Sequence, residues 1–237
     1  MRLSVENLSA GYGRIRVLHG ISINVDQGSS VGLFGPNGHG KTTLLRSISG
    51  IIPVEQGVIN FAGQDMRCKS SHQIVDAGLI HVPQGSTLLP RMTVIETLTL
   101  GAFPNHAWVQ RNNKLQEVFD IFPRLAERRH QNCNTLSGGE RQMAAIGVGL
   151  MGCPKLLMLD EPTLGLAPRI RQELAEQIGR VAQTGVTLVI VDQDVDLLLK
   201  LCPRLYLIEQ GTVSLEIKDR DELSHQDVIN RYFGNAA

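Results

Sequence analysis

Residues 30–45, with the sequence SVGLFGPNGHGKTTLL, constrain the fold more than any other part of the chain. The apolar run at 31–34 is typical of a buried strand. Residues 35–42 fit the pattern G-x-x-x-x-G-K-[ST], and apolar residues at helical spacing follow them. A strand, a glycine-rich loop and a helix in this order form the context in which this pattern binds phosphates. The stretch therefore predicts a nucleoside-triphosphate site on a parallel α/β sheet.

The residue types in this loop suit a triphosphate and a magnesium ion. Gly35, Gly38 and Gly40 allow backbone N–H groups to turn toward an anion, and the helix that follows adds partial positive charge. We expect Lys41 to contact the β- and γ-phosphates and the Thr42 hydroxyl to ligate Mg²⁺. A glycine-rich turn that matches by chance is the alternative, but it leaves the lysine, the threonine and the flanking elements unexplained.

The overall composition excludes several classes of protein. A length of 237 residues suits one α/β domain that carries an inserted subdomain. Equal numbers of basic and acidic residues, 23 of each, give no electrostatic case for nucleic acid as the main ligand. Four scattered cysteines without C-x-x-C spacing favour reduced thiols over a zinc site or disulfides. Because no apolar run approaches the roughly 20 residues of a membrane span and no secretory signal is visible, we expect a soluble intracellular protein.

The order of apolar patterns predicts strands and helices that alternate around one parallel sheet within a single domain of residues 1–237. Strand patterns occur at 3–8, 17–25, 31–34, 58–61, 79–82, 156–159, 187–191, 206–209 and 213–217. After the helix behind the loop, helical patterns occur at 92–100, 113–121, 138–151, 169–182, 195–201 and 221–233. We interpret 3–8 as an antiparallel edge strand and the polar segment 105–113 as a loop. The mostly helical segment 85–151 is expected to form an inserted subdomain, which leaves 1–84 and 152–237 as the nucleotide-binding core.

The segment TLSGGERQ at 135–142 begins a helical pattern inside this insertion. Ser137 and Glu140 form the S-x-x-E pattern of a capping box, which alone accounts for both residues. Gly138 and Gly139 need another reason, because a glycine inside a helix costs about 1 kcal/mol relative to alanine. Two glycines in the first turn suggest a close backbone approach to another group. The bare N–H groups and the serine hydroxyl at this helix end would suit a second phosphate.

Two acidic residues, Asp160 and Glu161, directly follow the apolar strand pattern at 156–159. Parallel α/β sheets bind ligands at the carboxyl ends of their strands, so both carboxylates are expected near the glycine-rich loop. We expect Asp160 to hold Mg²⁺ together with Thr42, and Glu161 to polarise an attacking water. A solvated acidic turn is the alternative, and Pro162 is typical of such a turn.

Tyr12 is the one aromatic residue in the turn at 11–13, which separates the first two strand patterns. Its ring could stack on an adenine face, as aromatic side chains commonly do with bases. Local packing of a turn tyrosine explains the residue equally well. The residues alone leave both interpretations open.

In the order GPNGHGKTT, Gln84, LSGGERQ and LLMLDEP, these motifs resemble those of the ATPase subunits of ATP-binding cassette (ABC) transporters. The resemblance covers essentially the whole chain. It implies an α/β fold of the P-loop NTPase (RecA-like) class, with a parallel-sheet core, an antiparallel β subdomain and an inserted α-helical subdomain. It also implies ATP and Mg²⁺ as cofactors, and ATP hydrolysis coupled to transport across a membrane.

The resemblance assigns a role to each motif residue. Glu161 would be the general base, with Lys41 and Gln193 as the other catalytic residues, and Gln84 would face a membrane subunit. The residues that would contact ATP are Tyr12, Gly35, Pro36, Asn37, Gly38, His39, Gly40, Lys41, Thr42, Thr43, Gln84, Ser137, Gly138, Gly139 and Glu140. Those that would contact Mg²⁺ are Thr42, Gln84 and Asp160. In this family the segment 137–140 contacts the γ-phosphate of ATP that a partner ATPase holds.

Two positions depart from the usual family pattern. Gln193 stands where the family usually has a histidine, and glutamine can donate a hydrogen bond but cannot carry a proton as imidazole does. Ala167 stands where many relatives have an aspartate. Both features, with DEPTLGLAP, resemble the ATPases of uptake systems for branched-chain or hydrophobic amino acids, urea and amides. One mismatch remains at Gln84, where that type of subunit often has glutamate.

The resemblance implies three protein partners and no nucleic acid. They are a second ABC ATPase in a head-to-tail homo- or heterodimer, transmembrane permease subunits and, indirectly, a periplasmic or extracellular solute-binding protein. The expected location is the cytoplasmic face of the cell membrane, as a peripheral subunit. An ABC ATPase of another transporter type, such as lipid or polysaccharide export, and a non-transport ABC ATPase are the alternatives.

Overall fold

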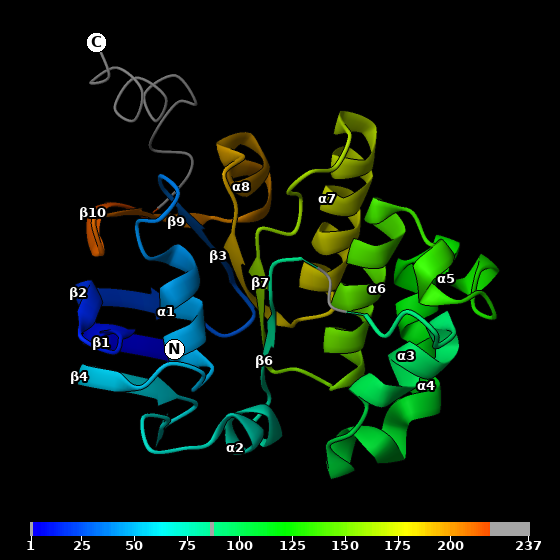
Figure 1. The fold of residues 1–237 in the computed structure, drawn as a ribbon, viewed down its shortest axis with the longest axis horizontal. Coiled ribbons are helices and arrows are strands. Elements are labelled where there is room, and N and C mark those ends of the chain that lie inside the picture. Colours follow the sequence, from blue (N-terminus) through cyan, green and yellow to red (C-terminus); the bar gives the residue numbers. More distant parts are fainter. Residues whose placement is uncertain (1, 86–87, 219–237) are drawn as a thin grey trace.

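The computed structural model describes residues 2–85 and 88–218 (Figure 1). Its central sheet contains the strands β3 Ser30–Phe34, β6 Leu79–Val82, β7 Leu156–Asp160, β8 Thr187–Val191, β9 Arg204–Glu209 and β10 Thr212–Ile217. Their order is β10-β9-β3-β8-β7-β6, with β10 antiparallel to β9 and all other neighbours parallel. Every residue of β3, β7 and β8 is buried, which explains why these strands read as continuous apolar runs.

A second, antiparallel sheet contains β1 Leu3–Tyr12, β2 Ile15–Val25, β4 Val54–Phe61 and β5 Gln64–Asp65. Their order is β2-β1-β4-β5. The expectation of an edge strand at 3–8 is wrong, because β1 pairs with β2 on one side and with β4 on the other. The alternation that suggested an edge arises from a sheet with one covered face, in which an interior strand alternates equally. Helix α1 (Lys41–Ile48) joins this sheet to the central one through the fully buried Leu44, Leu45 and Ile48.

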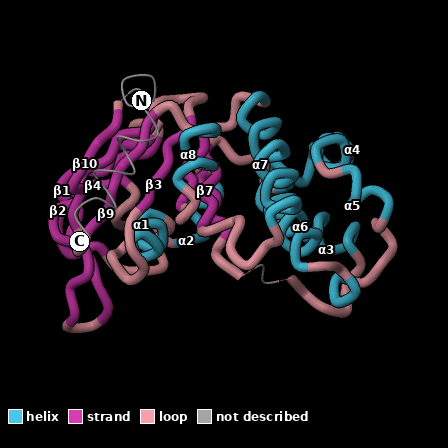
Figure 2. Tube along the Cα trace, turned by 90° about the horizontal axis from the view of Figure 1, so that it is seen from above, coloured by secondary structure: helices cyan, strands magenta, loops and turns pink. Residues whose placement is uncertain are grey.

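Helices cover the other face of the central sheet and extend outward from it (Figure 2). They are α3 Val94–Gly101, α4 Asn105–Ile121, α5 Pro123–Glu127, α6 Gly138–Met151, α7 Pro168–Gln183 and α8 Val195–Leu201, and the short α2 (Ser71–Asp76) lies near β6. One apolar core joins strand residues such as Leu157 and Leu188 to helix residues such as Ile146. Within the described residues, no helix is both long and apolar enough to span a lipid bilayer.

Most of the predicted helices are confirmed, with ends that differ by a few residues. The loop predicted at 105–113 is wrong, because α4 begins at Asn105 after an extended Pro104. Ala107 is the only buried residue in the first two turns of α4, so this half of the helix has the polar composition of a loop. The short helices α2 and α5 went unpredicted because five or six residues carry little periodicity. The helix predicted at 221–233 lies outside the described residues.

Candidate nucleotide site

Four neighbouring parallel strands bring the sequence motifs together at one edge of the central sheet. β3 leads into the glycine-rich loop, β8 ends before Gln193, β7 ends at Asp160 and β6 ends before Gln84. Since parallel strands present their carboxyl ends at the same edge, segments far apart in the sequence meet there. Together they form a cavity of about 300 Å³, lined by Asn37, Gly38, Gly40, Lys41, Thr42, Thr43, Gln84, Glu161, Leu164 and Gln193.

The glycines of the loop are required by both backbone conformation and packing. Gly35 has a φ of 143° and Gly40 a φ of 105°, values that favour glycine. A Cβ atom on Gly35 would lie 2.1 Å from the carbonyl oxygen of Ile208 in β9. A Cβ on Gly40 would lie 2.8 Å from the side chain of Leu18 in β2. The loop is therefore packed closely against both sheets.

Lys41 begins α1 and lies almost completely buried within the loop, with 4% of its surface exposed. Its Nζ donates hydrogen bonds to the carbonyl oxygens of Gly35 at 2.7 Å and Pro36 at 2.9 Å. Burial lowers the pKa of Lys41, and the nearby carboxylates of Glu161 and Asp160 oppose that shift. The ammonium group is thus fixed at the loop, where a phosphate oxygen would compete with the two carbonyls.

The Thr42 hydroxyl and the Asp160 carboxylate are directly connected. Thr42 Oγ1 donates a hydrogen bond to Asp160 Oδ1 at 3.1 Å. Asp160 is 1% exposed, and its Oδ2 has no hydrogen-bond partner among the described residues. Burial raises the pKa of Asp160, which the hydrogen bond from Thr42 partly offsets. A buried carboxylate oxygen without a partner, next to a threonine hydroxyl, is a donor set that fits Mg²⁺.

Glu161 lies at the meeting point of three segments and is 9% exposed. Its Oε2 accepts a hydrogen bond from Gln84 Nε2 at 3.2 Å and another from Gln193 Nε2 at 3.1 Å. Its backbone has a φ of 48°, an uncommon value for a non-glycine residue, and its N–H donates to the carbonyl of Val191 at 2.8 Å. The fixed backbone and the two amides together set the direction of the carboxylate.

A further acidic residue near this site, Asp192, was not singled out from the sequence. It is 4% exposed and accepts a hydrogen bond from Thr163 Oγ1 at 2.8 Å. Its other oxygen accepts from the backbone N–H of Asp194 at 2.9 Å. Burial raises the pKa of Asp192 despite these bonds. Asp192 therefore connects the segment after Glu161 to the segment that carries Gln193. Its position directly after the buried strand β8 is the sequence feature that could have identified it as a site residue.

The capping box predicted at Ser137 is confirmed. Ser137 Oγ accepts a hydrogen bond from the N–H of Glu140 at 3.3 Å, and Glu140 Oε2 accepts one from the N–H of Ser137 at 2.9 Å. The two glycines differ in their surroundings. A Cβ on Gly139 would lie 2.3 Å from Cγ2 of Ile170 in α7, whereas one on Gly138 would lie no closer than 3.9 Å, to Leu166. Packing inside the chain therefore explains Gly139, and Gly138 has room beside it.

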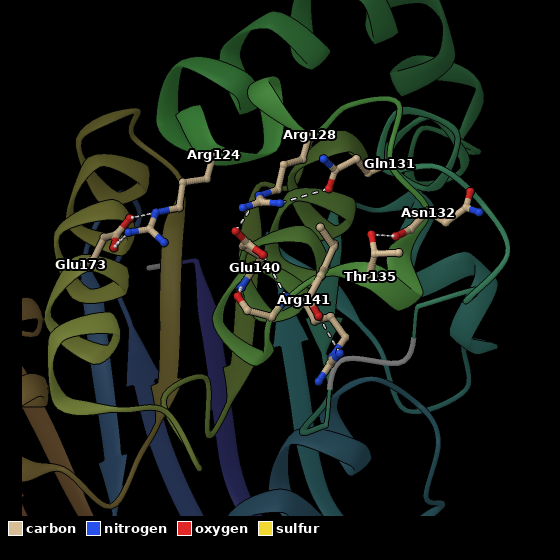
Figure 3. Close-up of polar contacts among 10 residues, drawn as sticks. Arg124, Arg128, Gln131, Asn132, Thr135, Glu140, Arg141 and Glu173 are labelled. Atoms are coloured by element: carbon tan, nitrogen blue, oxygen red, sulfur yellow. Dashed lines mark hydrogen bonds and ion pairs between the residues drawn. The ribbon is translucent and has the colours of Figure 1, made fainter.

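Two arginines lie near this helix start, Arg124 in α5 and Arg128 directly after the end of α5 (Figure 3). Arg128 Nε forms an ion pair with Glu140 Oε1 at 2.8 Å, and Arg124 Nε forms one with Glu173 Oε1 of α7 at 2.8 Å. Burial alone would raise the pKa of Glu140, but the hydrogen bonds from Ser137 and the charge of Arg128 lower it overall. No sequence motif indicated a role for Arg128. Its contact with Glu140 arises from the way α5 packs next to α6, which the sequence alone does not reveal.

The family model described as "ABC transporter" matches residues 18–164, which is more than half of the chain. The chain belongs to the ABC transporter family. The high-affinity branched-chain amino acid transport ATP-binding protein BraG of Pseudomonas aeruginosa is 38% identical over 98% of this chain and 99% of that protein. Among solved structures, an ATP-binding cassette of an ABC transporter is similar with a TM-score of 0.87, at 25% identity, over 100% of this chain and 98% of the other. An ABC cassette in its ADP conformation has a TM-score of 0.83, at 27% identity, over 98% of each chain.

Membership in the ABC transporter family makes the chain an ATPase, with the predicted parallel-sheet core and antiparallel sheet. In this ABC ATPase, the motif residues fall into three groups. The loop, Gln84, Glu161 and Gln193 share one cavity. Tyr12 is 46% exposed at the end of β1, and its hydroxyl accepts a hydrogen bond from Arg46 at 3.1 Å. The segment 137–140 does not line the cavity that the described residues form around the loop.

Proposed function

We propose that the chain is the ATP-hydrolysing subunit of an ABC importer for branched-chain amino acids or a related small polar solute such as urea or an amide. The observation that carries this proposal is the position of Glu161, whose carboxylate two amides hold at the cavity of the phosphate-binding loop. The similarity to BraG over nearly the full length of both chains supports the class of solute.

ATP would bind with its phosphates on the loop 35–43 and its adenine on Tyr12. Two observations support this placement. Residues of the loop and of the first turn of α1 line the cavity, and the start of a helix favours an anion. Tyr12 is exposed, and the hydrogen bond from Arg46 connects its hydroxyl to α1, the helix that follows the loop. Such a ring offers an apolar face to a base.

Thr42 and Asp160 would hold Mg²⁺, with Gln84 as a third ligand from the end of β6. The chemistry that Mg²⁺ supplies in such sites is neutralisation of charge on the β- and γ-phosphate oxygens. The unpartnered Oδ2 of Asp160 supports the assignment, because a buried carboxylate oxygen is costly without a hydrogen bond or a cation. The amide oxygen of Gln84 would contact the ion, and its Nε2 would remain the donor to Glu161.

Glu161 would act as the general base. Its Oε2 is occupied by the amides of Gln84 and Gln193, so Oε1 is the oxygen that we assign to the attacking water. Oε1 takes a proton from that water while the oxygen of the water forms a bond to the γ-phosphorus. The bond from the γ-phosphorus to the bridging oxygen breaks, and ADP keeps the electron pair. Lys41 neutralises charge on the transferred group, and Gln193 orients Glu161 without exchanging a proton.

A second ATPase chain would complete each site. The segment 137–140 lies on α6, away from the cavity of its own loop, and Gly138 leaves an open approach to its backbone. Two chains in a head-to-tail arrangement would place the helix start of one opposite the loop of the other. ATP then stabilises the closed pair through contacts that the open pair lacks, and hydrolysis removes them.

The permease would dock in an apolar cleft next to Gln84. This cleft has a volume of about 440 Å³ and includes Pro83, directly before Gln84, and Leu89, Leu100 and Phe103, which are more than half exposed. Exposed apolar residues around a cleft are typical of a protein–protein contact. Because the cleft adjoins Gln84, a movement of Gln84 when ATP binds would shift the surface that contacts the membrane subunit. This contact would lie on the cytoplasmic side of the membrane.

The Glu161→Gln variant tests this function. It should bind ATP with unchanged affinity, lose ATP hydrolysis, and form an ATP-dependent dimer on size-exclusion chromatography. Glu176→Gln, the same change on an exposed position of α7, is the matched control and should behave as wild type. Near-normal hydrolysis by Glu161→Gln would remove Glu161 from the role of base. Purification of the chain with its membrane subunits, followed by uptake assays in vesicles, tests the class of solute.

A further inference from the structure

The start of α6 has little intrinsic preference for the helical conformation. Its first two residues, Gly138 and Gly139, are glycines, each of which costs a helix about 1 kcal/mol relative to alanine. Packing of Ile170 against Gly139 fixes one side of this turn. The direction of the remaining N–H groups therefore depends on the capping interactions of Ser137 and Glu140.

The capping carboxylate depends in turn on Arg128. Glu140 is 5% exposed, and its two oxygens have different partners. Oε2 accepts from the N–H of Ser137 at 2.9 Å, and Oε1 pairs with Nε of Arg128 at 2.8 Å (Figure 3). A buried carboxylate is stable as an ion only with a close cation and satisfied hydrogen bonds. Nη1 of Arg128 also donates to Gln131 at 3.1 Å, which fixes the guanidinium plane.

Helix α5 is itself anchored, so that Arg128 approaches Glu140 from a defined position. Pro123 is at the first helical position of α5, where its fixed φ suits a helix start. Arg124, four residues before Arg128, pairs with Glu173 of α7 through two contacts of 2.8 Å. The two arginines thus tie α5 to α7 on one side and to the start of α6 on the other.

We propose that Arg128 is a positioning residue for ATP binding across the ATPase dimer. By holding Glu140, it keeps Ser137 and the N–H of Gly138 in the geometry that receives the γ-phosphate of ATP bound to a second copy of this chain. The inference rests on the proposed function, which places the segment 137–140 at the partner's nucleotide. It adds a residue from outside that segment, at the C-terminal end of a different helix.

The position of α5 makes the effect separable from nucleotide binding by the same chain. Figures 1 and 2 place α5 and α1 on opposite sides of the molecule, with the central sheet and α6 between them. Loss of the Arg128 side chain therefore leaves the chain's own loop unchanged. A role in ATP binding across the dimer and a general role in folding then predict different results.

The experiment uses the full chain with Glu161→Gln as the parent, so that ATP is not consumed. The affinity of the chain's own loop is measured with a fluorescent ATP analogue at low protein concentration, and dimerisation with ATP by analytical ultracentrifugation. Arg128→Met should leave the analogue's affinity unchanged and weaken the dimer about tenfold, because a hydrogen-bonded partner of a charged group is lost. Arg128→Lys should give an intermediate dimer, since lysine retains the charge without the planar fork.

Two further variants sharpen the result. Arg129→Met is the matched control, because Arg129 contacts the neighbouring His130 at 3.1 Å and no residue of the capping box. It should dimerise as the parent does. In a Glu140→Gln background, Arg128→Met should weaken the dimer no further, since the carboxylate that Arg128 positions is absent.

The outcomes are distinct. Equal dimerisation of Arg128→Met and the parent would overturn the role of Arg128 while leaving the proposed function intact. Equal weakening of nucleotide affinity and dimerisation would also overturn it, because that result indicates a general loss of structure. If Arg128→Met does not fold, an Arg128→Lys dimer as strong as the parent's decides against the role. A parent that does not dimerise with ATP would overturn this inference, because it requires ATP bound to a second copy of this chain, whereas a parent that does not bind the ATP analogue would overturn the proposed function itself.

Discussion

Replacement of Gln193 by alanine should slow ATP hydrolysis about tenfold and leave the KM for ATP nearly unchanged. Gln193 donates one of the two hydrogen bonds that Glu161 Oε2 accepts, at 3.1 Å, and Gln84 donates the other at 3.2 Å. A hydrogen bond to a charged group contributes about 1.5–3 kcal/mol. Gln193 is exposed, so a water molecule can partly compensate for the lost hydrogen bond, and the lower end of this energy range applies. About 1.5 kcal/mol in the barrier corresponds to about tenfold in rate.

The assay is steady-state phosphate release by the purified chain, with kcat and KM determined separately. Gln84→Ala removes the second donor, and the double variant should lose more activity than the product of the single effects, because the carboxylate then has neither amide to orient it. Gln193→His is the conservative control and should retain activity, since a ring N–H can donate to the same oxygen. A Gln193→Ala variant with wild-type kcat, or one that changes only KM, would refute the reasoning.

Three further predictions concern single positions. Lys41→Ala should lose most of its affinity for ATP in a fluorescence titration, and unchanged binding would mean that the phosphate site lies elsewhere. Gly139→Ala should lower the unfolding free energy by about 1–3 kcal/mol through overpacking, whereas Gly138→Ala, which has room for a Cβ, should raise it by up to about 1 kcal/mol; equal values in thermal unfolding would contradict the packing difference. Burial, assisted by the charge of Arg46, lowers the pKa of His81 from 6.5 to about 4. As the pH falls from 7 to 5, the unfolded chain therefore gains a proton that the folded chain does not. The wild type should lose about 2 kcal/mol more stability than His81→Gln in urea titrations, and equal losses would be evidence against a buried neutral imidazole.

The local sequence was sufficient to predict those elements whose residue pattern is compatible with only one structure. The loop 35–42, the buried strand that ends at Asp160 and the capping box at Ser137 can each be recognised from a short run of neighbouring residues, and the structure has all three. The first half of α4, at 105–113, was not predicted because its local pattern does not indicate a helix. Its first turns bury only Ala107 and otherwise lack the apolar stripe that identifies a helix.

Contacts between distant segments could not be predicted from the sequence. The two hydrogen bonds to Glu161 require the strand order β3-β8-β7-β6, which differs from the order in the chain. The position of β1 inside its sheet likewise depends on β4, which lies more than forty residues further along the chain. Gly139 could be explained only once α7 was placed, because Ile170 occupies the space beside it.

The central claim is that each ATP site combines the loop of one chain with the helix start of another. The most direct measurement mixes two inactive variants, Lys41→Ala, which lacks a working loop, and Ser137→Arg, which lacks a working helix start. In a mixed dimer, the intact loop of one chain faces the intact helix start of the other, so one site is restored. With random pairing, the mixture should recover about a quarter of wild-type hydrolysis. If each site belonged to a single chain, mixing the two variants would restore no activity.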